Sequence, residues 1–242
     1  MHTNQFNQSF SVRMKKMIPY AGLATCAILY LVIIIAAIPY RGQQGETYSI
    51  FNHFISELGS QRFSTNQLIY NIGVVAAALG FAVFTYGLRF FCKSKTAIYA
   101  VNIGVVSSVL CVGVGLVPED YRYPHLILAF TFFCMMTLAV TLFSISILRE
   151  KENPFPKYLG LHGLLVPLAF ACFLAMPKHL MAAKRIEGAL FERPQIWWLP
   201  FMEWCLFFAL TSWIMLISLR MFDIARQNRT SYNLSSANLE MQ

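Results

Sequence analysis

The chain has 242 residues, of which 57% are hydrophobic and 12% are charged, and its formal net charge is +8. A soluble domain carries about 25% charged residues and about 45 to 50% apolar ones. The composition therefore excludes an ordinary soluble protein and indicates an integral membrane protein.

Six apolar segments follow one another along the chain, each long enough for the roughly 20 residues that a transmembrane helix needs. The predicted spans are residues 17–39, 66–91, 96–117, 124–148, 158–177 and 197–222. We therefore expect an all-α polytopic membrane protein whose residues 17–222 form a six-transmembrane-helix bundle. Residues 1–16 form a polar N-terminus. Residues 223–242 are rich in Asn and Ser and lack apolar periodicity, which predicts a disordered tail.

The basic residues distinguish the two sides of this predicted bundle. The side that receives both termini carries 12 of the 19 Lys and Arg residues, and the other side has seven bases for seven acids. By the positive-inside rule the first side is cytoplasmic. We expect a multi-pass protein of the plasma (cell inner) membrane with both termini in the cytoplasm. The excess charge is thus an orientation signal, and nucleic acid is not an expected partner.

The first outer loop, residues 40–65, contains the sequence Ser-Ile-Phe-Asn-His-Phe-Ile-Ser-Glu-Leu-Gly at residues 49–59. Its apolar and polar residues fall on opposite faces at helical spacing. The pattern predicts a short interfacial helix with Ser49 as N-cap and Gly59 as its C-terminal stop. The apolar face would rest on lipid or on the bundle. The polar face would present Asn52, His53, Ser56 and Glu57.

His53 and Glu57 are four residues apart, so their side chains can meet on one face of that helix. A histidine and a carboxylate in this arrangement are able to bind a metal ion, act as an acid/base pair or contact a lipid headgroup. A purely structural polar face is the alternative interpretation.

The second outer connection brings further polar residues to the same side of the membrane. Glu119, Asp120, Arg122 and His125 fall between the third and fourth predicted spans. Charged turns commonly end a span, but their position opposite the first loop suggests one shared outer site. The last outer loop, residues 178–196, carries mixed charges and is in a position to cover that site.

Glu203 is the one acidic residue inside a predicted span. A carboxylate within the bilayer is costly unless it faces the bundle or water and finds a partner. We therefore expect Glu203 to point inward, with Arg122 or His125 as its partner. Both a structural and a functional role fit this residue.

Three short motifs carry a family resemblance: Phe54-Ile-Ser-Glu-Leu-Gly59, Asn71-Ile-Gly73, and Gly115-x-x-Pro-x-Asp120 followed by His125. Over about residues 17–222 the chain resembles the prokaryotic membrane family catalogued as domain of unknown function 998. It is more distantly similar to the eukaryotic six-span proteins of GPI-anchor lipid remodelling and DRAM type. The resemblance implies six spans and no settled activity, and it singles out Ser56, Glu57, Gly59, Asn71, Pro118, Asp120 and His125. Glu57 stands where an aspartate is commoner in the family pattern, which leaves the geometry of any metal site open.

Two functional hypotheses follow. The first is a binding or accessory membrane protein whose outer polar cluster engages a lipid headgroup or a partner, with Asn52, Ser56 and Arg122 as ligand-binding residues. The alternative is an intramembrane lipid-modifying hydrolase or transferase. Its candidate metal ligands or acid/base groups are His53, Glu57, Asp120 and His125, with Glu203 as a further catalytic candidate.

The alternative would call for a divalent metal as cofactor. Membrane lipid is the expected partner, and a protein partner or homo-oligomer is left open. A small-solute transporter is disfavoured, because one acidic residue lies within a span and no pair of broken helices is evident.

Overall fold

The computed structural model describes residues 2–92, 94–181, 184–185 and 191–240. The α-helices of this part are α1 (His2–Ala37), α2 (Gln67–Gly87), α3 (Lys95–Leu116), α4 (Arg122–Arg149), α5 (Lys157–Gly163), α6 (Leu165–Leu174), α7 (Lys178–Met181) and α8 (Trp198–Glu240). Two 3-10 helices, η1 (Ile55–Gly59) and η2 (Leu88–Phe90), lie between them. The two-residue strands β1 (Lys184–Arg185) and β2 (Phe191–Glu192) pair antiparallel.

Six helical segments of the described chain are long and apolar enough to cross a membrane. They are Met14–Ala37, Gln67–Phe90, Lys95–Leu116, Arg122–Arg149, Lys157–Leu174 and Trp198–Gln227. Each corresponds to one predicted span, so the all-α, six-span architecture is confirmed. The length of an apolar segment is informative here because a helix satisfies its backbone hydrogen bonds internally, as a lipid environment requires.

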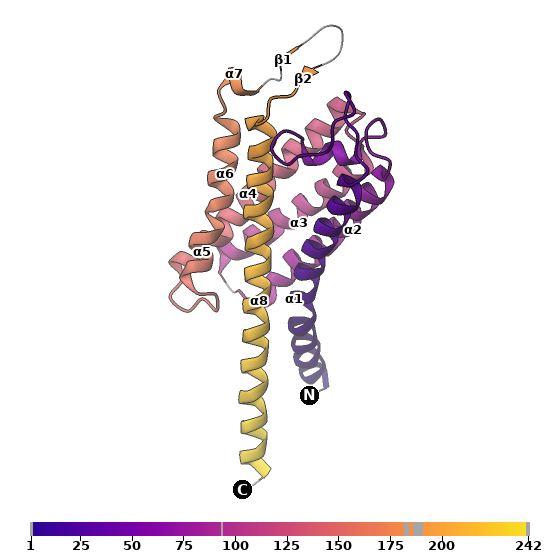
Figure 1. Cartoon of the computed structure of the whole chain (residues 1–242). Helices are drawn as coiled ribbons and strands as arrows, with labels where there is room; N and C mark the ends of the chain where they lie inside the picture. The colour runs from indigo at the N-terminus through magenta and orange to yellow at the C-terminus, as the bar shows by residue number, and fades with distance from the viewer. Residues whose placement is uncertain (1, 93, 182–183, 186–190, 241–242) are drawn as a thin grey trace.

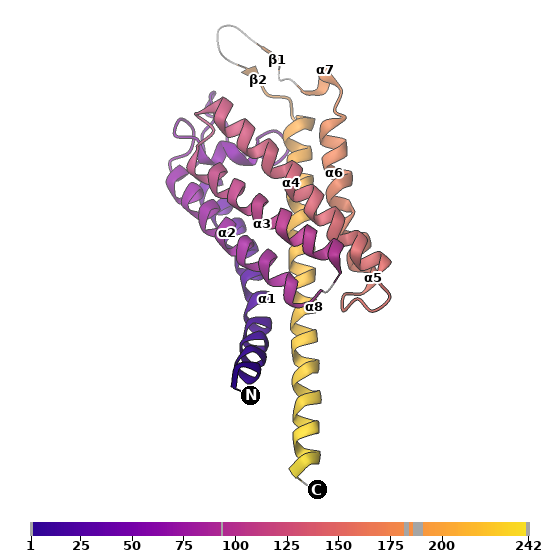
Figure 2. The ribbon, with the colours of Figure 1, turned by 180° about the vertical axis from the view of Figure 1, so that it is seen from behind.

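The spans pack in a ring. Along the chain α1 packs on α2, α2 on α3, α3 on α4, and α4 on α5 and α6, and α8 closes the ring against α6 and α1 (Figures 1 and 2). The start of α1 and the end of α8 lie at one end of the bundle, which we call the terminal face. The first loop (residues 38–66), the connection 117–121 and residues 191–197 lie at the opposite end, the loop face.

Small residues permit the closest helix contacts in this ring. Gly73 of α2 lies directly against the Val32 side chain of α1. A Cβ atom at Gly104 of α3 would lie 2.5 Å from Thr85 Cγ2 of α2. Such contacts bring backbones together and are typical of helix packing in lipid.

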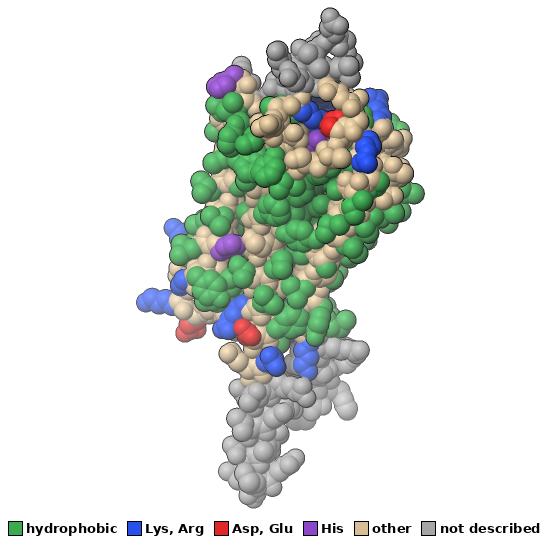
Figure 3. All heavy atoms as spheres, in the orientation of Figure 1, with side chains coloured by type: hydrophobic (Ala, Val, Ile, Leu, Met, Phe, Trp, Pro, Cys, Tyr) green, Lys and Arg blue, Asp and Glu red, His purple; other side chains and the backbone are tan. Residues whose placement is uncertain are grey.

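The outer surface fits a membrane environment. Hydrophobic side chains cover the middle of the bundle, and charged side chains gather toward its two ends (Figure 3). Large apolar residues such as Leu31, Leu79 and Ile127 are more than half exposed to the surroundings. Exposed apolar area on this scale would be unfavourable in water and is stable in lipid.

Two helices continue beyond their predicted spans. α1 already begins at His2, within the polar N-terminus, and α8 continues to Glu240, through the tail for which the sequence predicts disorder. Extending a helix that has already formed adds one hydrogen bond per ordered residue, so a polar segment can follow an apolar one without a new nucleation step.

The fifth span is interrupted. It was predicted as one helix over residues 158–177, but it consists of α5 and α6, which meet at Leu164, and it ends at Leu174. Pro167 lacks the N–H that would continue the helical hydrogen bonds across this point. The proline therefore accounts for the break.

Candidate functional site

The first loop does not form the predicted amphipathic helix over residues 49–59. Only η1 is helical, and it is a 3-10 helix of five residues. Ahead of it, the His53 N–H donates to the Ser49 carbonyl at 3.0 Å and closes a turn. Ser49 therefore begins a turn and does not cap a helix.

The two faces of this segment are also not divided as expected. His53 is 1% exposed and Glu57 is 4% exposed, whereas Phe51, from the expected buried face, is 47% exposed. The prediction of an outward polar face was wrong. The partners that stabilise these buried polar groups come from distant segments, and the local periodicity carries no information about them.

Glu57 lies at the centre of a polar network that we call the Glu57 cluster, made of Tyr40, Glu46, His53, Glu57 and Arg193. The Glu57 carboxylate accepts four hydrogen bonds, from Tyr40 Oη (2.8 Å), Phe54 N (2.9 Å), Arg193 Nη1 (3.1 Å) and Arg193 Nη2 (2.7 Å). A carboxylate has about four acceptor positions. The acceptor capacity of Glu57 is thus used by the protein itself.

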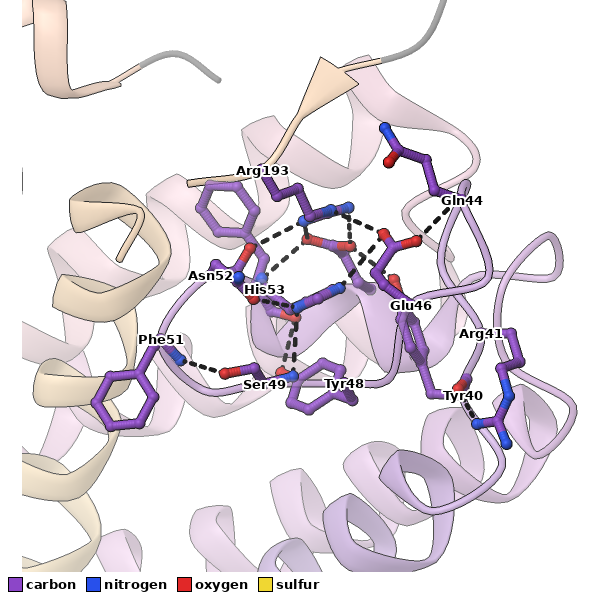
Figure 4. A network of polar contacts seen from close by, with 12 residues as sticks. Tyr40, Arg41, Gln44, Glu46, Tyr48, Ser49, Phe51, Asn52, His53 and Arg193 are labelled. Atoms are coloured by element: carbon purple, nitrogen blue, oxygen red, sulfur yellow. Dashed lines mark hydrogen bonds and ion pairs between the residues drawn. The ribbon is translucent and has the colours of Figure 1, made fainter. Parts of the chain in front are cut away.

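Arg193 reaches this cluster from the last loop (Figure 4). Its Nε donates to Glu46 Oε1 at 3.1 Å and its Nη1 donates to the Asn52 carbonyl at 2.9 Å. Burial opposes the charge of Arg193, but hydrogen bonds and the charge of Glu57 raise its pKa above the ordinary value. Burial and then the Glu57 charge raise the pKa of Tyr40, so its hydroxyl remains a donor.

His53 is a buried member of the same cluster. Its Nδ1 lies 2.7 Å from Asn52 Oδ1, and its Nε2 lies 3.7 Å from Glu46 Oε1 and has no hydrogen-bond partner. Burial, followed by the nearby Arg193 charge, lowers the pKa of His53. His53 and Glu57 therefore do not form the direct pair suggested by their spacing, because the Glu57 carboxylate is hydrogen-bonded to Arg193 instead.

Asp120 belongs to a separate contact on the loop face. Its carboxylate accepts from Ser60 Oγ at 3.0 Å and from the Gln61 N–H at 2.8 Å, and it lies 3.6 Å from Arg62 Nε. Asp120 thus holds the second connection against the end of η1. Arg122, expected to bind a ligand, is exposed at the start of α4.

The candidate metal ligands are divided among three places. His53 and Glu57 lie in one cluster, Asp120 lies in another, and His125 Nδ1 is 2.6 Å from the Val117 carbonyl. In the part of the chain that the structure describes, no group of three or more His, Cys, Asp or Glu side chains is arranged to hold a metal ion. The four side chains therefore do not come together as one metal site.

A cavity of about 120 Å³ lies inside the ring, below η1. Helices α1, α2, α3, α4 and α8 line it mainly with apolar side chains. Four of its lining residues carry polar groups near the loop face: Ser56, Tyr70, His125 and Glu203. Of the predicted site residues, Ser56, His125 and Glu203 therefore meet at this cavity, while Asn52, His53, Glu57, Asp120 and Arg122 do not line it.

Glu203 points into the bundle as predicted, but its partner is different. Its Oε2 accepts a hydrogen bond from the Ile55 N–H at 2.9 Å. The expected partners were wrong: Arg122 is exposed, and His125 is bonded to Val117. Ile55 begins η1, so the orphan backbone donors at the start of that helix supply the partner.

Sequence reasoning did not single out two residues of the loop face. Arg193 was one of several charges in a loop with no clear pattern. Glu119 was taken with its neighbour Asp120 as part of a charged turn, yet its Oε2 is buried without a hydrogen-bond partner. Burial, followed by the Glu57 and Glu203 charges, raises the pKa of Glu119 to about 8. A turn of this composition gives no local signal that distinguishes a buried acid from an exposed one.

Comparison with other proteins places the chain in a family. No curated protein and no solved structure matches it. The sequence profile described as "Protein of unknown function (DUF998)" matches residues 23–220. The match covers the second to fifth spans, the greater part of the first and sixth spans, η1, the Glu57 cluster and Asp120. This chain therefore belongs to the DUF998 family of proteins of unknown function.

Proposed function

We propose that this protein binds a lipid-derived amphiphile, with an apolar chain in the central cavity and the polar head beside Ser56, His125 and Glu203. The observation that carries the proposal is the composition of the cavity, which is apolar along its length and polar at its loop-face end. Ligand sites have this character: mostly apolar walls with a few polar groups that orient the ligand.

The size of the cavity supports the same proposal. Its volume of about 120 Å³ is of the order of the roughly 150 Å³ engineered cavity that binds benzene. A space of this size and apolar character suits a segment of a hydrocarbon chain, and membrane lipids are the most abundant source of such chains around the protein.

The loop-face polar residues offer less to a ligand. Glu57 already accepts four hydrogen bonds, and Asp120 already bonds Ser60 and Gln61. A headgroup would have to displace these internal contacts before it could bind there. The Glu57 cluster and Asp120 instead hold η1 above the cavity, which gives them a positioning role.

A cavity-filling variant tests the proposal. Ala78 lines the cavity, and Ala76, two residues away on α2, is exposed. We expect Ala78→Phe to reduce the lipid that is retained by the detergent-extracted protein, measured by native mass spectrometry, while Ala76→Phe leaves it unchanged. Equal retention in both variants would contradict binding in the cavity.

The orientation in the membrane is part of the proposal. The 12 basic residues that the sequence assigns to the side of the two termini favour a cytoplasmic position for both termini, in the plasma membrane. The polar end of the cavity, beside Ser56, His125 and Glu203, would then lie toward the outer leaflet.

A further inference from the structure

Glu203 has hydrogen-bonding capacity that the protein does not use. Among the described residues, the Ile55 N–H is the one hydrogen-bond donor to its carboxylate, at 2.9 Å. A carboxylate offers about four acceptor positions. No ion pair of the described residues includes Glu203. The carboxylate therefore presents unused acceptor positions at the polar end of the cavity.

His125 presents a second acceptor at the same end. It is 4% exposed and lines the cavity, and its Nδ1 lies 2.6 Å from the Val117 carbonyl. A carbonyl oxygen can only accept, so Nδ1 must carry the hydrogen. In the neutral imidazole, Nε2 is then an acceptor. No described residue donates to it.

We propose that the amphiphile in the cavity has a head that donates hydrogen bonds, a hydroxyl or a primary amine, to Glu203 and His125. This inference rests on the proposed binding function and specifies its ligand class. A fatty acid in its ionised form fits poorly, because its carboxylate has no hydrogen to donate and carries the same charge as an ionised Glu203. The hydroxyl of Ser56, which also lines the cavity, can donate or accept and so adapts to either head.

The hydroxyl and the amine share the donor and differ in charge. An ammonium head would supply Glu203 with the basic partner that it lacks within the protein, as charged groups in membranes require. A hydroxyl head would bind without that charge. The experiment therefore compares a probe with a hydroxyl head and a probe with an amine head.

The test uses the full chain in liposomes and three photoactivatable probes with the same chain: a long-chain alcohol, the matching amine and the matching carboxylic acid. Each carries a diazirine at the same carbon near the head. Labelled peptides are identified by mass spectrometry. We expect the alcohol, the amine or both to label the cavity segments of α2 and α8 about tenfold more than the acid, which is the value of one hydrogen bond to a charged group.

Glu203→Gln is the matched variant. Its amide oxygen can still accept from the Ile55 N–H, but the side chain gains N–H donors and loses its charge. We expect the preference for donor heads to fall by about tenfold in this variant, with labelling of the cavity retained. Glu152→Gln, on the exposed connection between α4 and α5, should leave the preference unchanged.

The outcomes separate the two proposals. If no probe labels the cavity segments, the binding function itself fails. If the acid labels them as strongly as the alcohol and the amine, binding stands and the donor-head inference is overturned. The preference measured on the unaltered chain decides this point even if the variant is poorly folded. Stronger labelling by the amine assigns a cationic head, and stronger labelling by the alcohol assigns a neutral one.

Discussion

Arg193 donates two hydrogen bonds to the Glu57 carboxylate, at 2.7 and 3.1 Å, across 136 residues of sequence. This bidentate contact joins the last loop to the first. The Arg193 and Glu57 side chains are 17% and 5% exposed, so the ion pair is largely shielded from solvent. Because Glu57 is part of η1, the pair also fixes the element that lies above the cavity.

We predict that Arg193→Ala destabilises the protein strongly. Removing one partner of a buried ion pair leaves the other charge buried and unpaired, which typically costs about 3 to 5 kcal/mol. Thermal unfolding of the purified protein in detergent should show the loss. Arg122→Ala removes an exposed arginine from the same face and should change stability by no more than about 0.5 kcal/mol.

A double-mutant cycle tests the pairing itself. Glu57→Ala combined with Arg193→Ala should cost less than the sum of the two single changes, because neither charge is then left alone. Additive effects would show that the two side chains do not depend on each other.

We predict that Asp120→Ala loosens the end of η1. The change removes the acceptor for the Ser60 hydroxyl and the Gln61 N–H. Hydrogen exchange followed by mass spectrometry should show faster exchange in peptides that contain residues 57–62. Asp223→Ala, on α8 toward the terminal face, is the control. If this control variant also exchanges faster in the peptides that contain residues 57–62, Asp120 has no specific role.

We predict that the protonation of Glu119 makes the stability of the folded protein depend on pH. Its pKa is raised by burial and neighbouring carboxylates from an ordinary value of 4.5 to about 8. Below pH 4.5 the carboxyl is protonated in both the folded and the unfolded chain. Between 4.5 and about 8 the unfolded chain releases the proton and the folded chain keeps it, so rising pH favours unfolding.

Glu119→Gln removes this effect because the amide does not titrate. We expect the variant to melt at a higher temperature than the unaltered protein above pH 8, with the difference vanishing toward pH 4.5. Glu152→Gln, at an exposed position, serves as the control. A difference that stays constant across this pH range would contradict the assignment to Glu119.

The membrane orientation is open to a direct measurement. We predict that a fluorescent protein fused after residue 242 folds in the cytoplasm, because the basic residues concentrate on the terminal face. An epitope inserted near Gly45, in the first loop, should be accessible to antibody on intact cells after removal of any outer envelope. Accessibility of the C-terminal fusion instead would reverse the proposed topology.

The candidate site was only partly predictable from the sequence. The inward position of Glu203 followed from its cost in lipid, and the structure adds that Ser56 and His125 line the same cavity. The partner of Glu203 was not predictable, because a backbone N–H carries no residue-specific signal. The role of Arg193 was also hidden, since a lone arginine in a mixed-charge loop gives no sign of which carboxylate it meets.

The fold of the first loop was also only partly predictable from the local sequence. Residues 49–59 have a helical pattern of apolar and polar side chains, yet only η1 is helical, and His53 and Glu57 are as deeply buried as Leu58. Local periodicity assumes that polar groups seek water. Here Arg193 and Tyr40 donate hydrogen bonds to Glu57 within the protein, so long-range contacts stabilise a carboxylate that the local pattern places in water.

The sequence by itself determined the six spans, because lipid requires long apolar helices with internally bonded backbones and such segments are visible in composition alone. The tertiary structure decided how the polar residues are divided: Glu57 with Arg193, Asp120 with the end of η1, and Glu203 with His125 at a central cavity. That division depends on which distant side chains come within about 3 Å of one another, and this distance is set by the packing of the helices and not by spacing along the chain.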